Sequence, residues 1–143
     1  MTVEKIMSTI LVTVEMDDTL RTIKEIFDHS KFHHLLVVES GKLFGVISDR
    51  DLLKALSPYI GTRSEAARDL ASLNKKAHQI MTRTPITLQK NAQIDDAIAI
   101  FLNNTLSCIP IVDSGRAPVG IISWRDILKS LLSQDGRPAK NQQ

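Results

Sequence analysis

The sequence predicts a mixed α/β (α+β) fold made of two tandem repeats, each with the order strand, helix, strand, strand, helix. Three observations lead to it: a phrase that occurs twice, a wider match between the two halves, and strands that are apolar throughout. Residues 45–51 (GVISDRD) return as residues 120–126 (GIISWRD), 75 positions later. A repeat of domain size fixes the architecture before single residues are considered.

The match between the halves extends to both sides of the phrase. Residues 6–9 (IMST) correspond to 80–83 (IMTR), and residues 35–41 (LLVVESG) to 109–115 (IPIVDSG), at a spacing of 74. One extra residue near Ala117 accounts for the change of spacing. We interpret the chain as a duplication with four parts: a first repeat at 1–56, a linker helix at 57–75, a second repeat at 76–133 and a frayed tail at 134–143.

The elements of each repeat follow from apolar periodicity and from turn residues. Acceptors and acids mark the helix starts, and continuous apolar strands indicate a sheet that helices cover. The predicted elements of the first and then the second repeat are extended stretches at 11–14 and 85–88, helices from 17–19 and 91–93, strands at 35–38 and 109–112, turns at Gly41 and Gly115, returning strands at 43–47 and 119–122, and a second helix after each phrase.

Composition narrows the class of protein. A chain of 143 residues, 43% of them hydrophobic, holds one ordinary domain or two small halves that share a core. A net charge of +2 is too small to indicate nucleic acid or an anionic membrane by itself. The single Cys108 fits a reducing compartment, and the N-terminus lacks the pattern of a signal peptide. We therefore expect a soluble, cytoplasmic protein.

The linker is the most basic part of the chain. The spacing of Thr62 and Glu65 predicts a capping box that opens the linker helix. Residues 50–83 carry seven bases against three acids, which indicates either a solvated helix face or a surface for anionic phosphates or an acidic partner. The seven bases are Arg50, Lys54, Arg63, Arg68, Lys75, Lys76 and Arg83.

The repeated phrase allows two interpretations. Ser48 with Asp51, and Ser123 with Asp126, have the spacing of a capping box at a helix start. The same geometry suits ligand binding, because a helix N-terminus attracts phosphate and a carboxylate can accept hydrogen bonds from a ribose cis-diol. In that case the phrase's glycine would let a flat base lie against the strand. Spacing alone does not choose between them.

The whole pattern resembles the cystathionine-β-synthase (CBS) domain, a regulatory repeat, here present twice as a pair called a Bateman module. The resemblance rests on the IMS/T opening, the apolar strands LLVV and IPIV, the Ser-Gly turn and the Gly-x-x-Ser-x-x-Asp phrase, and it covers residues 3–56 and 76–132. It implies a pseudo-twofold pair with two clefts, each completed by the opposite repeat. In the family these clefts commonly bind AMP, ADP, ATP or S-adenosylmethionine.

The resemblance also implies ligand-binding residues, with the Asp on ribose, the Ser near ribose or phosphate and the Arg near phosphate. For the first cleft they are Gly45, Ser48, Arg50 and Asp51, with Thr84, Pro85, Ile86, Leu106 and Ser107 opposite. For the second cleft they are Gly120, Ser123, Arg125 and Asp126, with Ile10, Leu11, Val12, Phe32 and His33 opposite.

Some positions depart from the family pattern and predict unequal clefts. Leu36 stands where the second repeat has Pro110, and Trp124 replaces the residue seen as Asp49. Trp124 would narrow the second cleft or stack on a base, and His33 offers a hydrogen bond or a charge there.

No catalytic or metal-binding pattern stands out. His29 and His33 lack partners with zinc-site spacing, and Cys108 has the pattern of a small buried hydrophobe. The sequence contains no P-loop, GxSxG elbow or HExxH motif. We therefore expect neither an enzyme nor a metal protein.

Three functions remain. The first is an adenine-nucleotide sensor, for example of energy state, which pairs into a homodimer and modulates a separate effector protein. The second is a structural dimerisation or adaptor module with degenerate clefts. The third makes the basic linker a nucleic-acid surface, with strongly salt-dependent binding as its signature.

Overall fold

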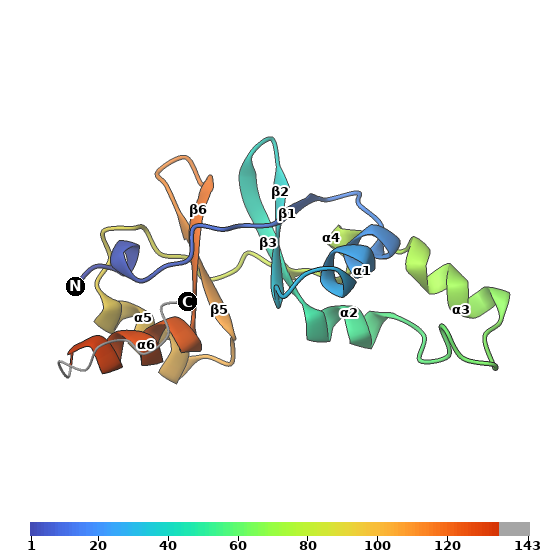
Figure 1. Ribbon diagram of the computed structural model, residues 1–143. Coiled ribbons are helices and arrows are strands. Elements are labelled where there is room, and N and C mark those ends of the chain that lie inside the picture. Colours follow the sequence, from blue (N-terminus) through green and yellow to red (C-terminus); the bar gives the residue numbers. More distant parts are fainter. Residues whose placement is uncertain (135–143) are drawn as a thin grey trace. The chain divides into compact units, whose positions relative to one another are not determined.

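The computed structural model describes residues 1–134 and divides into two compact units (Figure 1). The repeat-1 unit is Val12–Pro85. The repeat-2 unit joins Met1–Leu11 to Ile86–Gln143, of which residues up to Gln134 are described. The fold is the expected mixed α/β fold, and the predicted tail lies outside the described residues except for Gln134.

The repeat-1 unit holds a four-stranded sheet in the order β1-β2-β3-β4, with β1 parallel to β2 and the other pairs antiparallel. Leu35, Val37 and Ile47 of the sheet share a buried cluster with Leu20 and Ile23 of α1. The strands are β1 Thr13–Glu15, β2 His34–Glu39, β3 Lys42–Ser48 and β4 Thr82–Arg83. The helices are α1 Leu20–Asp28, α2 Asp49–Ala55, α3 Ala67–Ala71 and α4 Ala77–Ile80, with a 3₁₀ turn η2 at Ser72–Asn74.

The repeat-2 unit has the same plan in reduced form. Its hairpin of β5 and β6 is extended by two isolated bridges: Leu88 pairs with Ile111 in parallel, and Ser8 pairs with Ile121 in antiparallel fashion. The extended stretch predicted at 85–88 is therefore a single bridge, where repeat 1 has β1. The elements are η1 Val3–Lys5, α5 Ile94–Asn103, β5 Cys108–Val112, β6 Pro118–Ser123 and α6 Trp124–Gln134.

The segment that leads each repeat belongs to the unit of the other repeat. The N–H of Val3 donates to the carbonyl of Ala92 at 2.8 Å, and 74 residues on, the N–H of Ala77 donates to the carbonyl of Asp18 at 2.8 Å. Likewise β4 extends the sheet of repeat 1 while Ser8 bridges to β6 of repeat 2. The two repeats have thus exchanged their leading segments.

The linker begins its helix later than the sequence predicts. Thr62 Oγ1 donates to the carbonyl of Tyr59 at 2.6 Å, and Glu65 Oε1 accepts from the N–H of Gly61 at 3.0 Å. A turn at Gly61, whose φ is +79°, draws both side chains away from the predicted capping box. The helix instead begins after Ala66, whose N–H donates to Asp69 Oδ2 at 2.7 Å.

Candidate functional site

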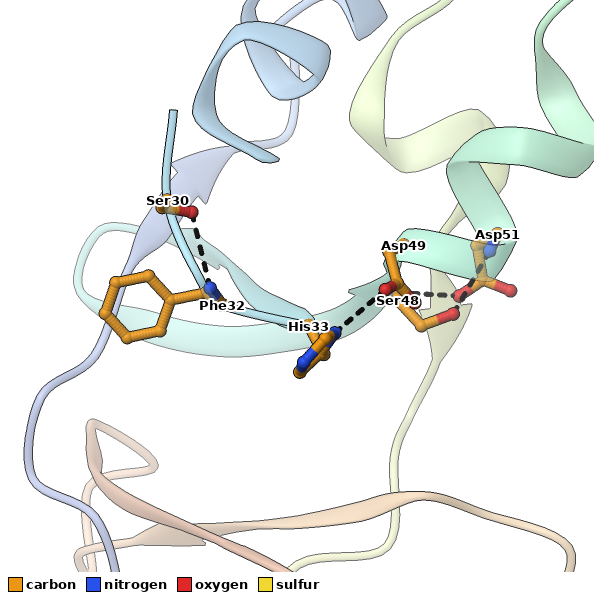
Figure 2. Close-up of polar contacts among 6 residues, drawn as sticks. All are labelled: Ser30, Phe32, His33, Ser48, Asp49 and Asp51. Atoms are coloured by element: carbon orange, nitrogen blue, oxygen red, sulfur yellow. Dashed lines mark hydrogen bonds and ion pairs between the residues drawn. The ribbon is translucent and has the colours of Figure 1, made fainter. Parts of the chain in front are cut away.

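The first copy of the phrase lies where β3 runs into α2, and its polar residues form a complete capping box. The N–H of Asp51 donates to Ser48 Oγ at 3.1 Å, and the N–H of Ser48 donates to Asp51 Oδ2 at 2.9 Å (Figure 2). Both side chains are half-buried. Such a cap stabilises a helix by about 1 kcal/mol. The capping interpretation is therefore confirmed for this repeat.

The second copy has a similar but not identical cap. The N–H of Ser123 donates to Asp126 Oδ2 at 2.9 Å, and Ser123 Oγ donates to the same oxygen at 3.1 Å. In both copies the cap contacts of the aspartate go to one carboxylate oxygen, Oδ2. The other oxygen, Oδ1, takes no part in either cap, so capping and ligand binding are compatible in this geometry.

A methionine from the exchanged segment packs on the glycine of each phrase. A Cβ on Gly45 would lie 2.4 Å from the Sδ of Met81, and a Cβ on Gly120 would lie 2.3 Å from the Sδ of Met7. Real Cβ atoms do not approach so closely, so each position excludes a side chain. The reason for these glycines is therefore close packing within each unit, with a methionine as the neighbour that the repeated phrase alone does not reveal.

His33 binds a residue of its own repeat. Its Nδ1 lies 3.0 Å from Asp49 Oδ2, and the N–H of Asp49 donates to the carbonyl of His33 at 3.0 Å (Figure 2). The hydrogen bond from the ring holds the pKa of the Asp49 carboxyl below its ordinary value. The His33 side chain remains 75% exposed, so the pair forms a polar group on the surface beside the first phrase.

The neighbouring His34 predicts a pH dependence of folding. Burial at the start of β2 lowers the pKa of His34 below its ordinary 6.5. As the pH falls through 6.5 the unfolded chain takes up this proton first, so the free energy of unfolding decreases below about pH 7. We expect His34→Gln to reduce this decrease between pH 7.5 and 5.5 in urea unfolding. Identical pH slopes for the variant and the parent would contradict this origin.

Trp124 is held by its own unit. Its ring lies 4.9 Å from that of Phe101 on α5, centroid to centroid, at a tilted angle of 37°. The side chain keeps 39% of its surface exposed. Of the two roles predicted for this tryptophan, the structure shows neither; it shows an aromatic pair within the repeat-2 unit.

Thr84 stands out among the residues predicted opposite the first phrase. It follows β4 in the repeat-1 unit, and its φ of +48° is strained for a β-branched residue. Its N–H donates to the carbonyl of Phe44 at 3.3 Å, which holds the strained residue beside the sheet. Strain of this kind is often found at ligand sites. Neither composition nor motif spacing indicates this backbone conformation.

The remaining predicted residues divide between the units. Arg50 and Arg125 are exposed next to their capped serines. The repeat-1 unit contains Val12, Phe32, His33, Thr84 and Pro85 together with the first phrase, and the repeat-2 unit contains Ile10, Leu11, Ile86, Leu106 and Ser107 together with the second phrase. Each unit thus joins one phrase to part of its predicted set, and the completion of each set by the other unit stays a prediction.

The structure also bears on metal and membrane binding. Within residues 1–134 no three His, Cys, Asp or Glu side chains gather in a way that could hold a metal ion. Among the helices of that part of the chain, none combines the length and the apolar character that a membrane-spanning segment requires.

Comparison with known proteins agrees with the duplication. The family model of the CBS domain matches residues 3–58 and 77–133. A CBS domain-containing protein of Dictyostelium discoideum, DDB_G0289609, is 28% identical over 132 residues, which cover 91% of this chain and 90% of that protein. The uncharacterized protein MJ1225 of Methanocaldococcus jannaschii is 32% identical over 130 residues, but the chain spans only 46% of its length.

Solved structures show the same architecture. The crystal structure of MJ1225, described as a putative archaeal homolog of g-AMPK, matches with a TM-score of 0.79 at 31% identity, covering 94% of this chain and 51% of that one. The CBS domain pair of protein MJ0100, solved in complex with 5′-methylthioadenosine and S-adenosyl-L-methionine, matches with a TM-score of 0.76 at 27% identity, covering 94% and 98%. The family model matches most of the chain, in two segments that coincide with the two repeats. This chain therefore belongs to the CBS domain family.

Proposed function

We propose that the protein is a regulatory module that binds an adenosine-containing ligand at the repeated phrase and passes the signal to a separate effector protein. The observation that carries the proposal is the geometry of Asp51 and Asp126. Each is fixed by a helix cap through Oδ2, in a unit that also presents an exposed arginine. The MJ0100 pair, which shares this fold at 27% identity, binds two adenosine compounds.

The chemistry of each phrase suits a nucleoside. The Oδ1 of Asp51 or Asp126 would accept hydrogen bonds from the two ribose hydroxyls, as a carboxylate does in dinucleotide sites. Ser48 or Ser123 would lie near ribose or phosphate, and Arg50 or Arg125 would pair with a phosphate or with the carboxylate of S-adenosylmethionine. The ligand would bind without a covalent step, so the proposed role is regulatory and not catalytic.

The two phrases differ in ways that predict unequal affinity. The first has the surface pair of His33 and Asp49 beside it, whereas the second has Trp124 at the position that matches Asp49. A phosphate near the first phrase would meet Arg50 but also the Asp49 carboxylate. We therefore expect one ligand to bind more tightly than a second.

A ligand screen tests the proposed function. We expect AMP, ADP, ATP or S-adenosylmethionine to raise the melting temperature by several degrees at a hundredfold excess over Kd, because binding to the folded state alone adds about 2.7 kcal/mol. Mass spectrometry of the denatured protein would identify any ligand that survives purification. No shift with any of the four, together with no bound nucleoside, would overturn the proposal.

A homodimer is the proposed means of passing on the signal. Leu128, Leu131 and Leu132 lie at helical spacing on α6 and are 58%, 46% and 50% exposed, and Leu102 on α5 is 71% exposed. Where the internal repeat places Leu102 on α5, it places Asp28 on α1, which forms an ion pair with Lys24. Repeat 1 thus has a charged residue where repeat 2 has Leu102. We propose that the face of repeat 2 pairs with the same face on a second copy by twofold symmetry.

A charge introduced at this face should dissociate the dimer. We expect Leu128→Glu to weaken self-association by about 100-fold or more, because a carboxylate would be desolvated at the centre of an apolar contact. Leu53→Glu is the matched control, since Leu53 is the counterpart of Leu128 in repeat 1 and is 74% exposed. Sedimentation velocity would measure both. Loss of the dimer in both variants, or in neither, would contradict a face confined to repeat 2.

A further inference from the structure

The stretch from the end of α2 to the start of α4 presents a basic face. Residues 54–76 contain five bases and two acids. The five bases, all exposed, are Lys54, Arg63, Arg68, Lys75 and Lys76. None of them forms an ion pair within residues 1–134. The stretch therefore carries a local surplus of positive charge that exceeds the net charge of the whole chain, +2.

The two acids of this stretch both accept hydrogen bonds from other residues of the same stretch. Glu65 Oε1 accepts from the N–H of Gly61 at 3.0 Å. Asp69 is only 5% exposed, and it accepts from Ser57 Oγ and from the N–H of Ala66, both at 2.7 Å. These hydrogen bonds lower the pKa of the Asp69 carboxyl, with that from Ser57 the largest cause. The carboxylates thus order the loop, and with five bases against two acids the stretch keeps a net charge of +3.

The same hydrogen bonds fold the stretch back on itself. The N–H of Ser57 donates to Ser72 Oγ at 3.2 Å, and Lys75 Nζ donates to the carbonyl of Ala55 at 3.1 Å. The chain just after α2 therefore lies beside η2, and α3 lies between them in the sequence. Lys75 thereby contacts Ala55, the residue that follows Lys54, although the two lie 20 positions apart in the sequence. The segment that carries the bases is thus held in a defined conformation by these contacts.

Residues 53–70 also carry large exposed apolar side chains. Leu53 is 74% exposed, Tyr59 51% and Leu70 38%. Leu53 precedes Lys54 on α2, and Leu70 follows the buried Asp69 on α3. Surfaces that bind nucleic acid are polar and strongly positive, and exposed leucines add nothing to phosphate contacts. The helix α3, which spans only Ala67–Ala71, is too short to lay an amphipathic face into a membrane surface.

We propose that the basic face docks an acidic segment of a separate protein, one that carries apolar side chains between its carboxylates. Its carboxylates would pair with the five bases and steer association, and its apolar side chains would cover Leu53, Tyr59 and Leu70. This names the chemistry of the effector that the proposed regulatory function requires. Docking needs no nucleotide, so the two proposals can fail separately.

Peptide binding to the nucleotide-free, full-length chain tests the inference. The probe is a fluorescent 16-residue peptide of Glu and Leu, with Leu at helical spacing, followed by anisotropy at 50 mM and 300 mM salt. We expect the double variant Lys54→Glu/Arg68→Glu to bind at least about tenfold more weakly, and Leu53→Ser to bind several-fold more weakly. The matched control Lys31→Glu/Lys42→Glu, which reverses two exposed bases elsewhere in the repeat-1 unit, should bind like the parent.

Three results would overturn the inference. One is equal binding by the double variant and its control, which would leave only the net charge of the chain. Another is equal binding of a peptide with Ser in place of Leu, which would remove the role of the apolar side chains. The last is tighter binding of a 16-nucleotide DNA or of vesicles with 30% phosphatidylserine, lost in the same double variant, which would assign the face to nucleic acid or to a membrane.

Discussion

Replacing Asp51 with asparagine is expected to weaken binding of an adenosine ligand at the first phrase by about 100-fold. The reason is chemical and not steric. A ribose diol donates two hydrogen bonds to an ionised carboxylate, and bonds of this kind contribute about 1.5–3 kcal/mol each. The amide oxygen would stay with the N–H of Ser48, which bonds Oδ2 at 2.9 Å, so the NH₂ group, a donor, would face the ribose diol. The helix cap therefore survives in the variant while the diol loses its acceptors.

The chain contains a carboxylate that separates the two roles of Asp51. Asp96 caps α5 in the same way, with its Oδ2 accepting from the N–H of Gln93 at 2.9 Å, but it lies outside both phrases. We expect Asp96→Asn to leave affinity unchanged in calorimetric titration, and Asp126→Asn to remove only the second binding event. Equal losses in the Asp96 and Asp51 variants would show that affinity depends on helix capping in general, and unchanged affinity in the Asp51 and Asp126 variants would reject the ribose contact.

Adding a single methyl group at Gly45 is expected to lower the free energy of unfolding by about 1–3 kcal/mol. The new Cβ would lie 2.4 Å from the Sδ and 2.8 Å from the Cγ of Met81, which is itself only 8% exposed. The methionine is packed in the cluster of the repeat-1 unit, so it cannot swing away without leaving a void. Urea unfolding would measure the loss, and Gly120→Ala should act in the same way through Met7.

A double-mutant cycle shows whether the methionine is the cause. Met81→Ala removes the obstructing side chain and should itself cost about 2–5 kcal/mol. In the double variant the methyl at position 45 occupies part of the space that Met81 left. The loss of unfolding free energy in the double variant should therefore be smaller than the sum of the two single losses. Gly115→Ala serves as control, because its nearest neighbour, Asp113 Oδ1, lies at an ordinary 3.5 Å. Strict additivity would place the origin of the loss elsewhere.

Local pattern predicted most of the fold. The apolar runs LLVV and IPIV became β2 and β5, and the phrase became a strand end, a cap and a helix in both repeats. These features depend on neighbours within a few residues, which the sequence displays directly. The predicted linker cap was wrong because the Glu65 side chain bonds to the turn at Gly61. Asp69 caps the helix instead.

Contacts between distant segments could not be predicted in the same way. Nothing near Met7 or Met81 shows that each packs on the glycine of the other repeat, more than 30 residues away along the chain. The strained backbone of Thr84 has no signature in composition either. For the candidate site, the residue types and their caps came from spacing, whereas only the structure shows which carboxylate oxygen each cap uses.

The exchange of leading segments has a consequence for the history of the chain. A single repeat cut out at the duplication boundary would keep a leading segment whose hydrogen-bond partners lie in the other repeat. Val3 bonds to Ala92, and Ala77 bonds to Asp18. A protein with one repeat could make the same exchange of leading segments only with a second copy of itself. Joining two such repeats in one polypeptide would turn these contacts between molecules into contacts within a chain, and each half could then diverge.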